Sequence, residues 1–356
     1  MKREYYNVIG VMSGTSLDGI DFAYVKITTK PQYTAEVIVA ETQAYPDVWV
    51  EKLQKAVDHS KDKLQELNED YTQYLGEAIN RFIEKNTISR DQIDALCSHG
   101  HTILHQPDQG YTLQIGNLPE IATITKCTVV CDFRVQDVAM GGQGAPLVPI
   151  GDQLLFQTYD YCLNLGGFAN VSMQKGTIRI AYDICAVNTV LNVYAQKLGA
   201  AYDDEGAFAK AGTTHIPLLE KLNTLPFFEK LPPKSLGIEW VHEYIFPMIK
   251  SFDLEPTTVL ATFTEHIAQQ LAHQFEGGGT VLITGGGAYN TFLIERLKTL
   301  KNIDIVLPDP VLIEYKEAIV FGLLGVLKLE GKDNCLASVT GASKDHSSGV
   351  ILPYTI

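Results

Sequence analysis

The sequence predicts an α/β fold made of two similar domains, and three observations support this prediction. The chain has 356 residues, which is more than one ordinary domain core requires. Segments with the alternating pattern of strands follow segments with helical periodicity along the whole chain. Each half opens with a strand, a glycine-rich bend and a second strand, at residues 8–27 and 161–174. This repeated order of elements predicts an internal duplication.

In the first half, runs rich in apolar and β-branched residues predict strands at 8–12, 21–27 and 35–45. Residues 63–85 carry apolar side chains at helical spacing and predict a helix. Further strands are expected at 93–100, 111–116 and 128–133, with a short helix at 118–126.

In the second half, a third strand at 177–184 is expected to precede a helix at 188–199. A helix at 257–277, a strand at 280–287, a helix at 289–300 and a final helix at 317–331 follow. The glycine-rich stretch GGQGAPLVP at 141–149 predicts a crossing between domains. We therefore place the domains at 1–138 and 139–356, the last segment packing back on the first.

Composition and charge exclude several classes of protein. The net charge of −14 argues against a nucleic-acid binder, which would present a basic face. No apolar run reaches the roughly 18 residues that a membrane span requires, and the N-terminus lacks the pattern of a signal peptide. The six cysteines are scattered, which favours free thiols in a reducing cytoplasm. We expect a cytoplasmic protein without membrane or nucleic-acid partners.

The first glycine-rich bend, GVMSGTSLDGID at 10–21, carries unusual turn chemistry. Backbone amides exposed in such a turn, together with Ser and Thr hydroxyls, form an anion-binding nest. Asp18 and Asp21 offer carboxylate oxygens for Mg²⁺, with Asp18 the expected ligand. The alternative is a tight hairpin in which the polar side chains satisfy their own backbone.

Two further glycine-rich segments follow strands of the second half. The bend at Gly166 and Gly167 opens the second domain, so two hairpins could clamp one polyphosphate. The run Gly285–Gly287 stands between a strand and a helix start, where a ring or a phosphate can approach the backbone. A plain strand-to-helix turn is the alternative there. From the three segments together, the expected nucleotide-binding residues are Gly14, Thr15, Ser16, Leu17, Asp18, Gly19, Ile20, Asp21, Gly166, Gly167, Gly285, Gly286, Gly287 and Asn290.

Two other stretches carry candidate polar residues. Asp183 stands at the C-terminal end of an expected strand, where ligands collect in open α/β sheets. A carboxylate there is a candidate general base, and a helix N-cap is the alternative. The histidines of SHGHTILHQ lack a nearby cysteine or carboxylate at ligand spacing, so sugar recognition is favoured over zinc binding. The alternative is a pair of histidines that make hydrogen bonds within a turn.

Taken together, these stretches resemble one family. GVMSGTSLDGID, SHGHT, LQIG, VVCDFR, DVAMGGQGAPLVP, LNLGGFAN, ITGGGAYN and VTGA resemble the 1,6-anhydro-N-acetylmuramic acid kinases nearly end to end. The resemblance implies the actin/sugar-kinase fold, with two duplicated ribonuclease-H-like domains and an interdomain cleft.

The resemblance also implies a reaction. Such kinases use ATP, Mg²⁺ and water to open the 1,6-anhydro bridge and phosphorylate O6, which gives N-acetylmuramic acid 6-phosphate and ADP in peptidoglycan recycling. It implies that Asp183 activates the water and that His99, Arg134 and Glu317 line the sugar pocket. Arg134 is a natural partner for the lactyl carboxylate of the sugar, because a guanidinium binds carboxylates bidentately.

The sequence departs from the family pattern mainly on the sugar side. The departures are Ile184, Cys185 and Ala186 in place of Thr-Gly-Pro, His101 in place of Gln, Asn117 where an Asp is frequent, and DNCLASVTGA near the C-terminus. A kinase for a related amino sugar therefore stays an alternative, as does a non-catalytic ATP- or sugar-binding switch. The sequence leaves the oligomeric state open, a homodimer included.

Overall fold

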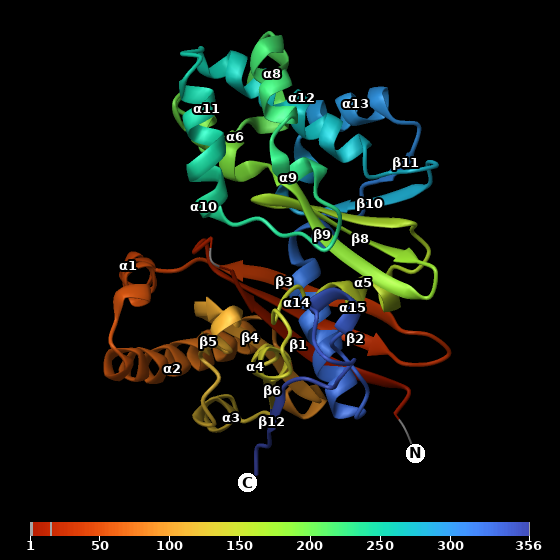
Figure 1. Ribbon diagram of the computed structural model, residues 1–356. Coiled ribbons are helices and arrows are strands. Elements are labelled where there is room, and N and C mark those ends of the chain that lie inside the picture. The colour runs from red at the N-terminus through yellow and green to blue at the C-terminus, as the bar shows by residue number, and fades with distance from the viewer. Residues whose placement is uncertain (1–2, 15, 356) are drawn as a thin grey trace. The chain divides into compact units, whose positions relative to one another are not determined.

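A computed structural model describes residues 3–14 and 16–355. The chain forms two compact units, each with its own sheet. Unit 1 comprises Met1–Leu155 and Tyr315–Ile356, and unit 2 comprises Phe156–Glu314. Figure 1 shows the helices and strands of each unit. The α/β class and the two-unit organisation expected from the sequence are confirmed.

Unit 1 is built on a seven-stranded sheet with the order β12-β6-β4-β1-β2-β3, and β5 pairs with β4 beside this path. β1 pairs antiparallel with β2 and parallel with β4, and β4 in turn pairs parallel with β6. The strands are β1 (Tyr5–Ser13), β2 (Ile20–Thr28), β3 (Thr34–Gln43), β4 (Ala95–Gln106), β5 (Tyr111–Ile115), β6 (Val129–Cys131) and β12 (Val350–Leu352).

Helices cover this sheet by burying apolar faces. α2 (Lys61–Lys85) buries an apolar stripe that includes Leu64, Leu75 and Phe82 in the core beneath β1 and β2. α14 (Pro310–Leu329) begins in unit 2 and lies so close to β1 that a side chain at Gly10 would overlap the Ala318 carbonyl oxygen. The other helices of unit 1 are α1 (Asp47–Lys55), α3 (Glu120–Thr125), α4 (Val135–Ala139), α5 (Pro149–Leu155) and α15 (Ala337–Thr340).

Unit 2 is built on a five-stranded sheet with the order β11-β10-β7-β8-β9. Its strands are β7 (Tyr161–Leu165), β8 (Phe168–Lys175), β9 (Ile178–Ala186), β10 (Thr280–Thr284) and β11 (Asp304–Val306). Its helices are α6 (Asn188–Gln196), α7 (Ala207–Ala211), α8 (Ile216–Asn223), α9 (Pro226–Glu229), α10 (Ile238–Trp240), α11 (Phe246–Lys250), α12 (Pro256–Ala272) and α13 (Thr291–Leu300). A π-helical turn at Val241–Ile245 joins α10 to α11.

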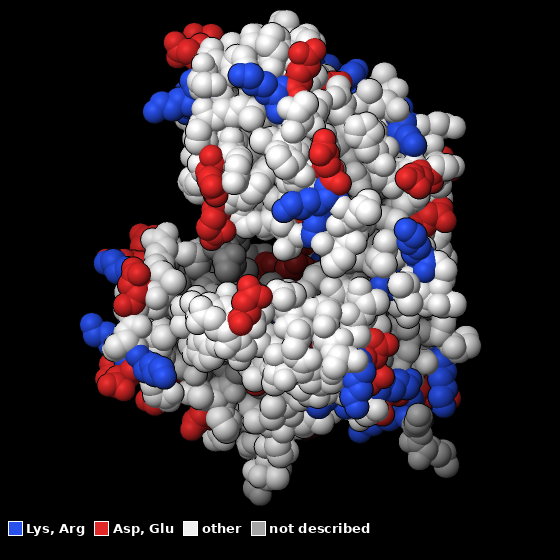
Figure 2. All heavy atoms as spheres, in the orientation of Figure 1, with Lys and Arg blue, Asp and Glu red and all other residues white. Residues whose placement is uncertain are grey.

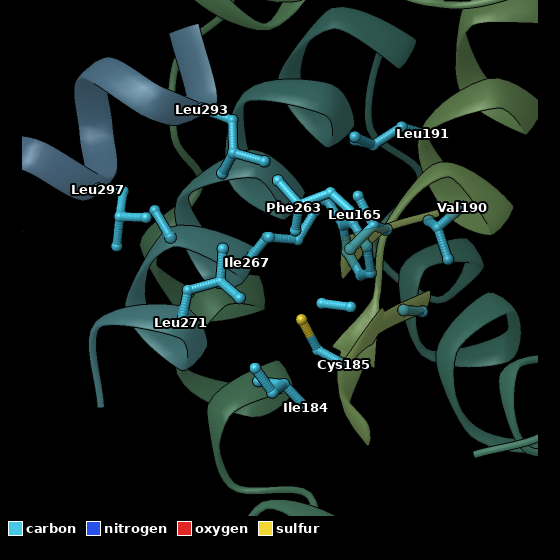
Figure 3. Packing of buried hydrophobic residues seen from close by; sticks show 14 of the residues in the cluster. Leu165, Ile184, Cys185, Val190, Leu191, Phe263, Ile267, Leu271, Leu293 and Leu297 are labelled. Carbon is cyan, nitrogen blue, oxygen red and sulfur yellow. The ribbon is translucent and has the colours of Figure 1, made fainter. Parts of the chain in front are cut away.

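The core of unit 2 forms between its sheet and α12. The middle of α12 is buried over most of its surface, which suits a helix enclosed by other elements. Figure 3 shows side chains from α12, α6, α13 and the strands packing together, among them Leu165, Ile184, Cys185, Val190, Leu191, Phe263, Ile267, Leu271, Leu293 and Leu297.

The two sheets repeat one topology. In unit 1 the path β3-β2-β1-β4-β6 has two antiparallel pairs followed by two parallel pairs. In unit 2 the path β9-β8-β7-β10-β11 has the same pairs in the same order. The internal duplication expected from the order of elements is therefore present in the strand pairing.

The boundary between the units lies later than position 138. α5 belongs to unit 1 because a side chain at Gly151 would overlap Val320 of α14, and because Asp152 forms a buried ion pair of 2.7 Å with Lys316. The final helix also begins seven residues earlier than the sequence pattern indicates, at Pro310 rather than at 317. Prolines are favoured in the first turn of a helix, which explains this start.

Charged side chains are mixed in sign on the face shown in Figure 2, where Lys and Arg alternate with Asp and Glu. Within the described part of the chain, no helix is both long enough and apolar enough to cross a membrane.

Candidate active site

The first glycine-rich bend joins β1 to β2 in unit 1. Ser16 donates its hydroxyl hydrogen to Asp18 Oδ1 over 2.7 Å, and the Leu17 N–H donates to Gly14 O over 3.4 Å. Leu17 adopts a φ of 60°, which turns the chain sharply and packs its side chain against the core. Ser16 and Asp18 stay exposed at the tip. Thr15, also expected to bind nucleotide, lies outside the described residues.

The end of this bend is fixed by β3. A Cβ at Gly19 would come within 2.6 Å of the Gln43 carbonyl oxygen, so this position excludes a side chain. The Ile20 side chain is fully buried in the core, which leaves only its backbone for any ligand. The Asp21 carboxylate accepts a hydrogen bond of 2.6 Å from Thr42. Of the two aspartates, Asp18 is thus the more exposed, and its oxygens with the Ser16 hydroxyl fit the oxygen preference of Mg²⁺.

A buried polar cluster lies where β1 enters the bend, and the sequence did not indicate it. Ser13 Oγ is 2.6 Å from the Tyr45 hydroxyl and 2.7 Å from His101 Nδ1, and Tyr45 also contacts the Tyr71 hydroxyl. Burial raises the pKa of Tyr45 to about 12 and lowers the pKa of His101 to about 4, so both side chains are neutral near pH 7. The cluster holds the end of β1 rigidly. Its members are far apart in sequence, which is why no local pattern indicated it.

His99 and Arg134 meet in unit 1. Arg134 donates from Nε to His99 Nε2 over 2.7 Å and from Nη1 to the Gly144 carbonyl oxygen over 2.6 Å. His99 donates from Nδ1 to the Gly100 oxygen over 2.9 Å, which assigns its tautomer. Burial, with the Arg134 charge, lowers the pKa of His99 well below its ordinary value. A neutral histidine thus supports the guanidinium, and the Nη2 group of Arg134 has no recorded partner among the described residues.

Glu317 lies on α14 in the same unit. Part of its side chain is exposed to solvent. Desolvation of the carboxylate by the surrounding protein raises its pKa, while the positive charge of Arg134 acts to lower it. The electrostatic influence is mutual, because the Glu317 charge stabilises protonated Arg134. Arg134 and His99 are thus hydrogen-bonded, and Arg134 and Glu317 shift each other's pKa within the same unit. Their role in sugar binding stays a prediction. The structure adds the Gly144 carbonyl as the group that aims the guanidinium.

In unit 2 the bend between β7 and β8 is bound to the start of α6. The Gly167 carbonyl accepts from the Val187 N–H over 2.8 Å and from the Thr189 hydroxyl over 2.9 Å. The Gly166 carbonyl accepts from the Asn188 N–H over 3.3 Å. These bonds occupy the first amides of α6, and the Gly166 N–H itself donates to the Phe168 carbonyl oxygen over 3.2 Å.

The third glycine-rich segment packs against the end of β7. A Cβ at Gly285, where φ is 81°, would lie 2.7 Å from Asn164 Oδ1, and one at Gly287 would lie 2.7 Å from the Leu165 Cβ. This close approach brings Gly285–Gly287 next to the Gly166 bend. Asn290 Oδ1 accepts from the Leu293 N–H over 3.0 Å as the N-cap of α13, which leaves its amide nitrogen for a ligand.

Asp183 lies within β9 and pairs with Asn170 of β8. The bulge next to Asp183 is in β9, where one residue is skipped before Cys185 pairs with Ala169. β9 continues to Ala186, so Asp183 precedes the strand end by three residues and is not a helix N-cap. Its Oδ2 accepts from the Leu236 N–H over 2.8 Å, and burial raises its pKa. For the other oxygen, Oδ1, the structure records no protein partner among the described residues. This arrangement fixes the carboxylate and leaves one oxygen able to take a proton.

The comparison with protein families covers almost the whole chain. The family described as "Anhydro-N-acetylmuramic acid kinase" matches residues 6–354. The chain belongs to the anhydro-N-acetylmuramic acid kinase family. The chain is 34% identical to the anhydro-N-acetylmuramic acid kinase of Mannheimia succiniciproducens, a match over 99% of this chain and 100% of the relative. It is also 34% identical to that of Shewanella sediminis, with the same coverage. The family resemblance and the sugar-kinase class are therefore confirmed.

Similarity to solved structures is weaker. The activator of the 2-hydroxyisocaproyl-CoA dehydratase from Clostridium difficile, solved with bound ADPNP, gives a TM-score of 0.45 at 11% identity, over 92% of this chain and 97% of the activator. Xylulose kinase from Rhodospirillum rubrum gives a TM-score of 0.42 at 11% identity, over 90% of this chain and 89% of that enzyme. Scores this low support no inference about anhydro-N-acetylmuramic acid kinase function in this chain.

Proposed function

We propose that this protein uses ATP and water to open 1,6-anhydro-N-acetylmuramic acid and to phosphorylate O6, which yields N-acetylmuramic acid 6-phosphate and ADP. The observation that carries the proposal is the family match over residues 6–354. Peptidoglycan recycling in the cytoplasm is the setting that fits such a substrate, and the buried cysteine thiols suit a reducing compartment.

ATP binding is assigned to the glycine-rich segments of both units. The bend at Gly14–Asp21 offers backbone amides and the Ser16 hydroxyl, and Asp18 would hold Mg²⁺ through an exposed carboxylate. Bound Mg²⁺ would supply positive charge for the phosphate oxygens. In unit 2 the support is the close packing of the Gly166 bend with Gly285–Gly287. These glycines have no Cβ atoms, so a ligand can approach their backbone closely. Asn290 contributes its amide nitrogen.

Asp183 is assigned as the general base. Its bonded Oδ2 holds the carboxylate in one orientation, and its Oδ1 takes the proton from the attacking water. Burial raises the pKa of Asp183, which strengthens the carboxylate as a base. Water adds to the anomeric carbon, the bond from this carbon to O6 breaks, and O6 then accepts the γ-phosphoryl group.

The sugar is assigned to His99, Arg134 and Glu317 of unit 1. Arg134 uses Nε for His99, so a side-on fork of Nε and Nη2 is not available to the lactyl carboxylate. The carboxylate would instead bind end-on to Nη2 and the remaining Nη1 hydrogen. Glu317 adds an acceptor for a sugar hydroxyl or amide.

A coupled ADP-release assay tests the proposal with MgATP and three sugars: 1,6-anhydro-N-acetylmuramic acid, N-acetylmuramic acid and N-acetylglucosamine. We expect turnover with the anhydro sugar, and we expect NMR of the product to show the phosphate from ATP at O6. Turnover with only one of the other two sugars would show that this sugar, and not the anhydro sugar, is the substrate. ATP binding without sugar-dependent ADP release would contradict the kinase assignment.

A further inference from the structure

Three side chains with metal-ligand chemistry meet inside unit 1, and none of them is assigned to the proposed reaction. They are Asp137 of α4 and, near the C-terminus, Cys335 and His346. Gly144 connects this cluster to Arg134 through its backbone hydrogen bonds. Asp137 Oδ1 is 3.1 Å from Cys335 Sγ and 3.7 Å from His346 Nε2, and the three ligand atoms lie within 4.8 Å of one another. The exposed fractions of these residues are 0%, 1% and 4%, so the cluster is buried.

The backbone holds these side chains in place. Cys335 and His346 form an isolated antiparallel bridge, with N–H···O bonds of 3.1 and 3.2 Å in the two directions. Residues in such a pair direct their side chains to the same face. The other Asp137 oxygen, Oδ2, accepts from the Gly144 N–H over 2.7 Å, which orients Oδ1 toward the bridge. The geometry is therefore built by the fold and does not depend on flexible side chains.

The imidazole of His346 is poised as a ligand. Its Nδ1 is 3.1 Å from the Lys344 carbonyl oxygen, so Nδ1 carries a hydrogen and Nε2 presents a lone pair. Nε2 is buried, faces the Asp137 carboxylate and has no hydrogen-bond partner among residues 3–14 and 16–355. A cation between these two atoms would give both of them a partner. A histidine whose second nitrogen donates to a backbone carbonyl is the usual arrangement around protein-bound metals.

We propose that Asp137, Cys335 and His346 form a Zn²⁺ site. Tetrahedral Zn²⁺ with bonds of about 2.0–2.3 Å spaces its ligand atoms by roughly 3.3–3.8 Å, close to the two distances at Asp137. Nitrogen, sulfur and carboxylate donors together favour zinc over magnesium or calcium. The Thr340 hydroxyl, 2.7 Å from Asp137 Oδ1, offers a fourth ligand.

Charge and proton balance are consistent with this assignment. Burial raises the pKa of the Cys335 thiol, which donates its hydrogen toward Asp137 when no metal is bound. Zn²⁺ binding forms the S–Zn bond and releases one proton to solvent. One thiolate and one carboxylate then neutralise the two positive charges of the ion. The site would fasten the C-terminal segment to the Asp137–Gly144 loop, and it does not depend on the proposed reaction.

The experiment uses the full-length protein, freed of metal with a chelator under reducing conditions and then titrated with Zn²⁺ or Co²⁺. We expect one ion per chain by mass spectrometry, a rise in Tm, and a near-ultraviolet thiolate-to-Co²⁺ charge-transfer band. The band needs no variant, so it tests the proposal even if a substitution impairs folding. A protein that binds no ion, or whose Co²⁺ complex lacks the thiolate band, overturns it.

Matched variants separate the site from other thiols. In Cys335→Ser the hydroxyl can still donate to Asp137, but the thiolate is lost, so affinity should fall on the order of 100-fold and the band should vanish. Cys127→Ser removes a buried thiol elsewhere in unit 1 and should bind Co²⁺ as the wild type does. Equal binding by wild type and Cys335→Ser would overturn the proposal, because the ion would then be held elsewhere.

Discussion

The role of Asp183 can be tested by a substitution that changes its chemistry and preserves its contact. In Asp183→Asn the side-chain oxygen can still accept the Leu236 N–H, which is 2.8 Å away in the wild type. The fold should therefore be retained, with a change in Tm of a few degrees at most. The amide cannot take a proton from water, so the base is removed with little other disturbance.

The expected loss follows from the assigned role. A positioned general base contributes about 10²–10⁴ in rate, which corresponds to about 2.7–5.5 kcal/mol of transition-state stabilisation. We expect kcat in the ADP-release assay to fall by that factor with 1,6-anhydro-N-acetylmuramic acid, while the ATP Kd from calorimetry stays within about twofold.

Asp160→Asn is the matched control, because the Asp160 carboxylate also accepts a backbone N–H over 2.8 Å in unit 2 but lies at an exposed position. This variant should turn over at the wild-type rate. Normal turnover by Asp183→Asn, or an equal loss in both variants, would refute the assignment of Asp183 as the base.

Three further predictions concern packing, pH and sugar binding. Gly10→Ala should lower the free energy of unfolding by about 3 kcal/mol in urea denaturation, because its Cβ overlaps the Ala318 carbonyl. Gly322→Ala, on α14 like Ala318, should be nearly neutral, since its Cβ meets a Val8 methyl group at 3.2 Å and helix propensity improves by about 1 kcal/mol. Equal losses of unfolding free energy in the two variants would contradict this reasoning. The pKa of His101 is held at about 4, below its unfolded value, so stability should fall as pH drops from about 6.5 toward 4. The unfolding free energy of wild type relative to His101→Gln should lose about 3 kcal/mol over this range, and a flat difference would show that His101 does not titrate as described. Arg134→Lys should raise the KM for sugar about 10–100-fold. A lysine ammonium cannot donate to both His99 and the Gly144 carbonyl and still present two hydrogens to a carboxylate. An unchanged KM would show that Arg134 does not bind the sugar.

Much of the fold could be predicted because local patterns persist in the tertiary structure. The helix expected at 63–85 is observed at Lys61–Lys85, and the strand expected at 21–27 at Ile20–Thr28. Both segments bury one regular set of side chains, so periodicity alone identifies them. α1 and α8 were not anticipated, because their short amphipathic patterns are weak signals. β12 was also missed, since three residues pair with β6 only after the chain returns to unit 1.

Some features of the candidate site were likewise recognisable in the sequence, and others were not. Asp183 and the three glycine-rich segments were recognisable because each stands in a short motif of distinctive composition. The orientation of Arg134 was not recognisable, since it depends on Gly144, which lies in a loop, and on His99, which lies in β4. The sequence likewise gave no hint that Asn290 caps α13.

By itself, the sequence determined the α/β class, the duplicated order of elements and the family. These properties follow from periodicity, composition and contiguous motifs, which are local along the chain. Only the tertiary structure decided that α5 belongs to unit 1, and that Ser13, Tyr45, Tyr71 and His101 form one buried cluster. It also brought Cys335 and His346 beside Asp137, nearly 200 residues earlier in the sequence. Contacts of this kind depend on how β-strands and α14 pack, and that packing is a property of the folded chain as a whole.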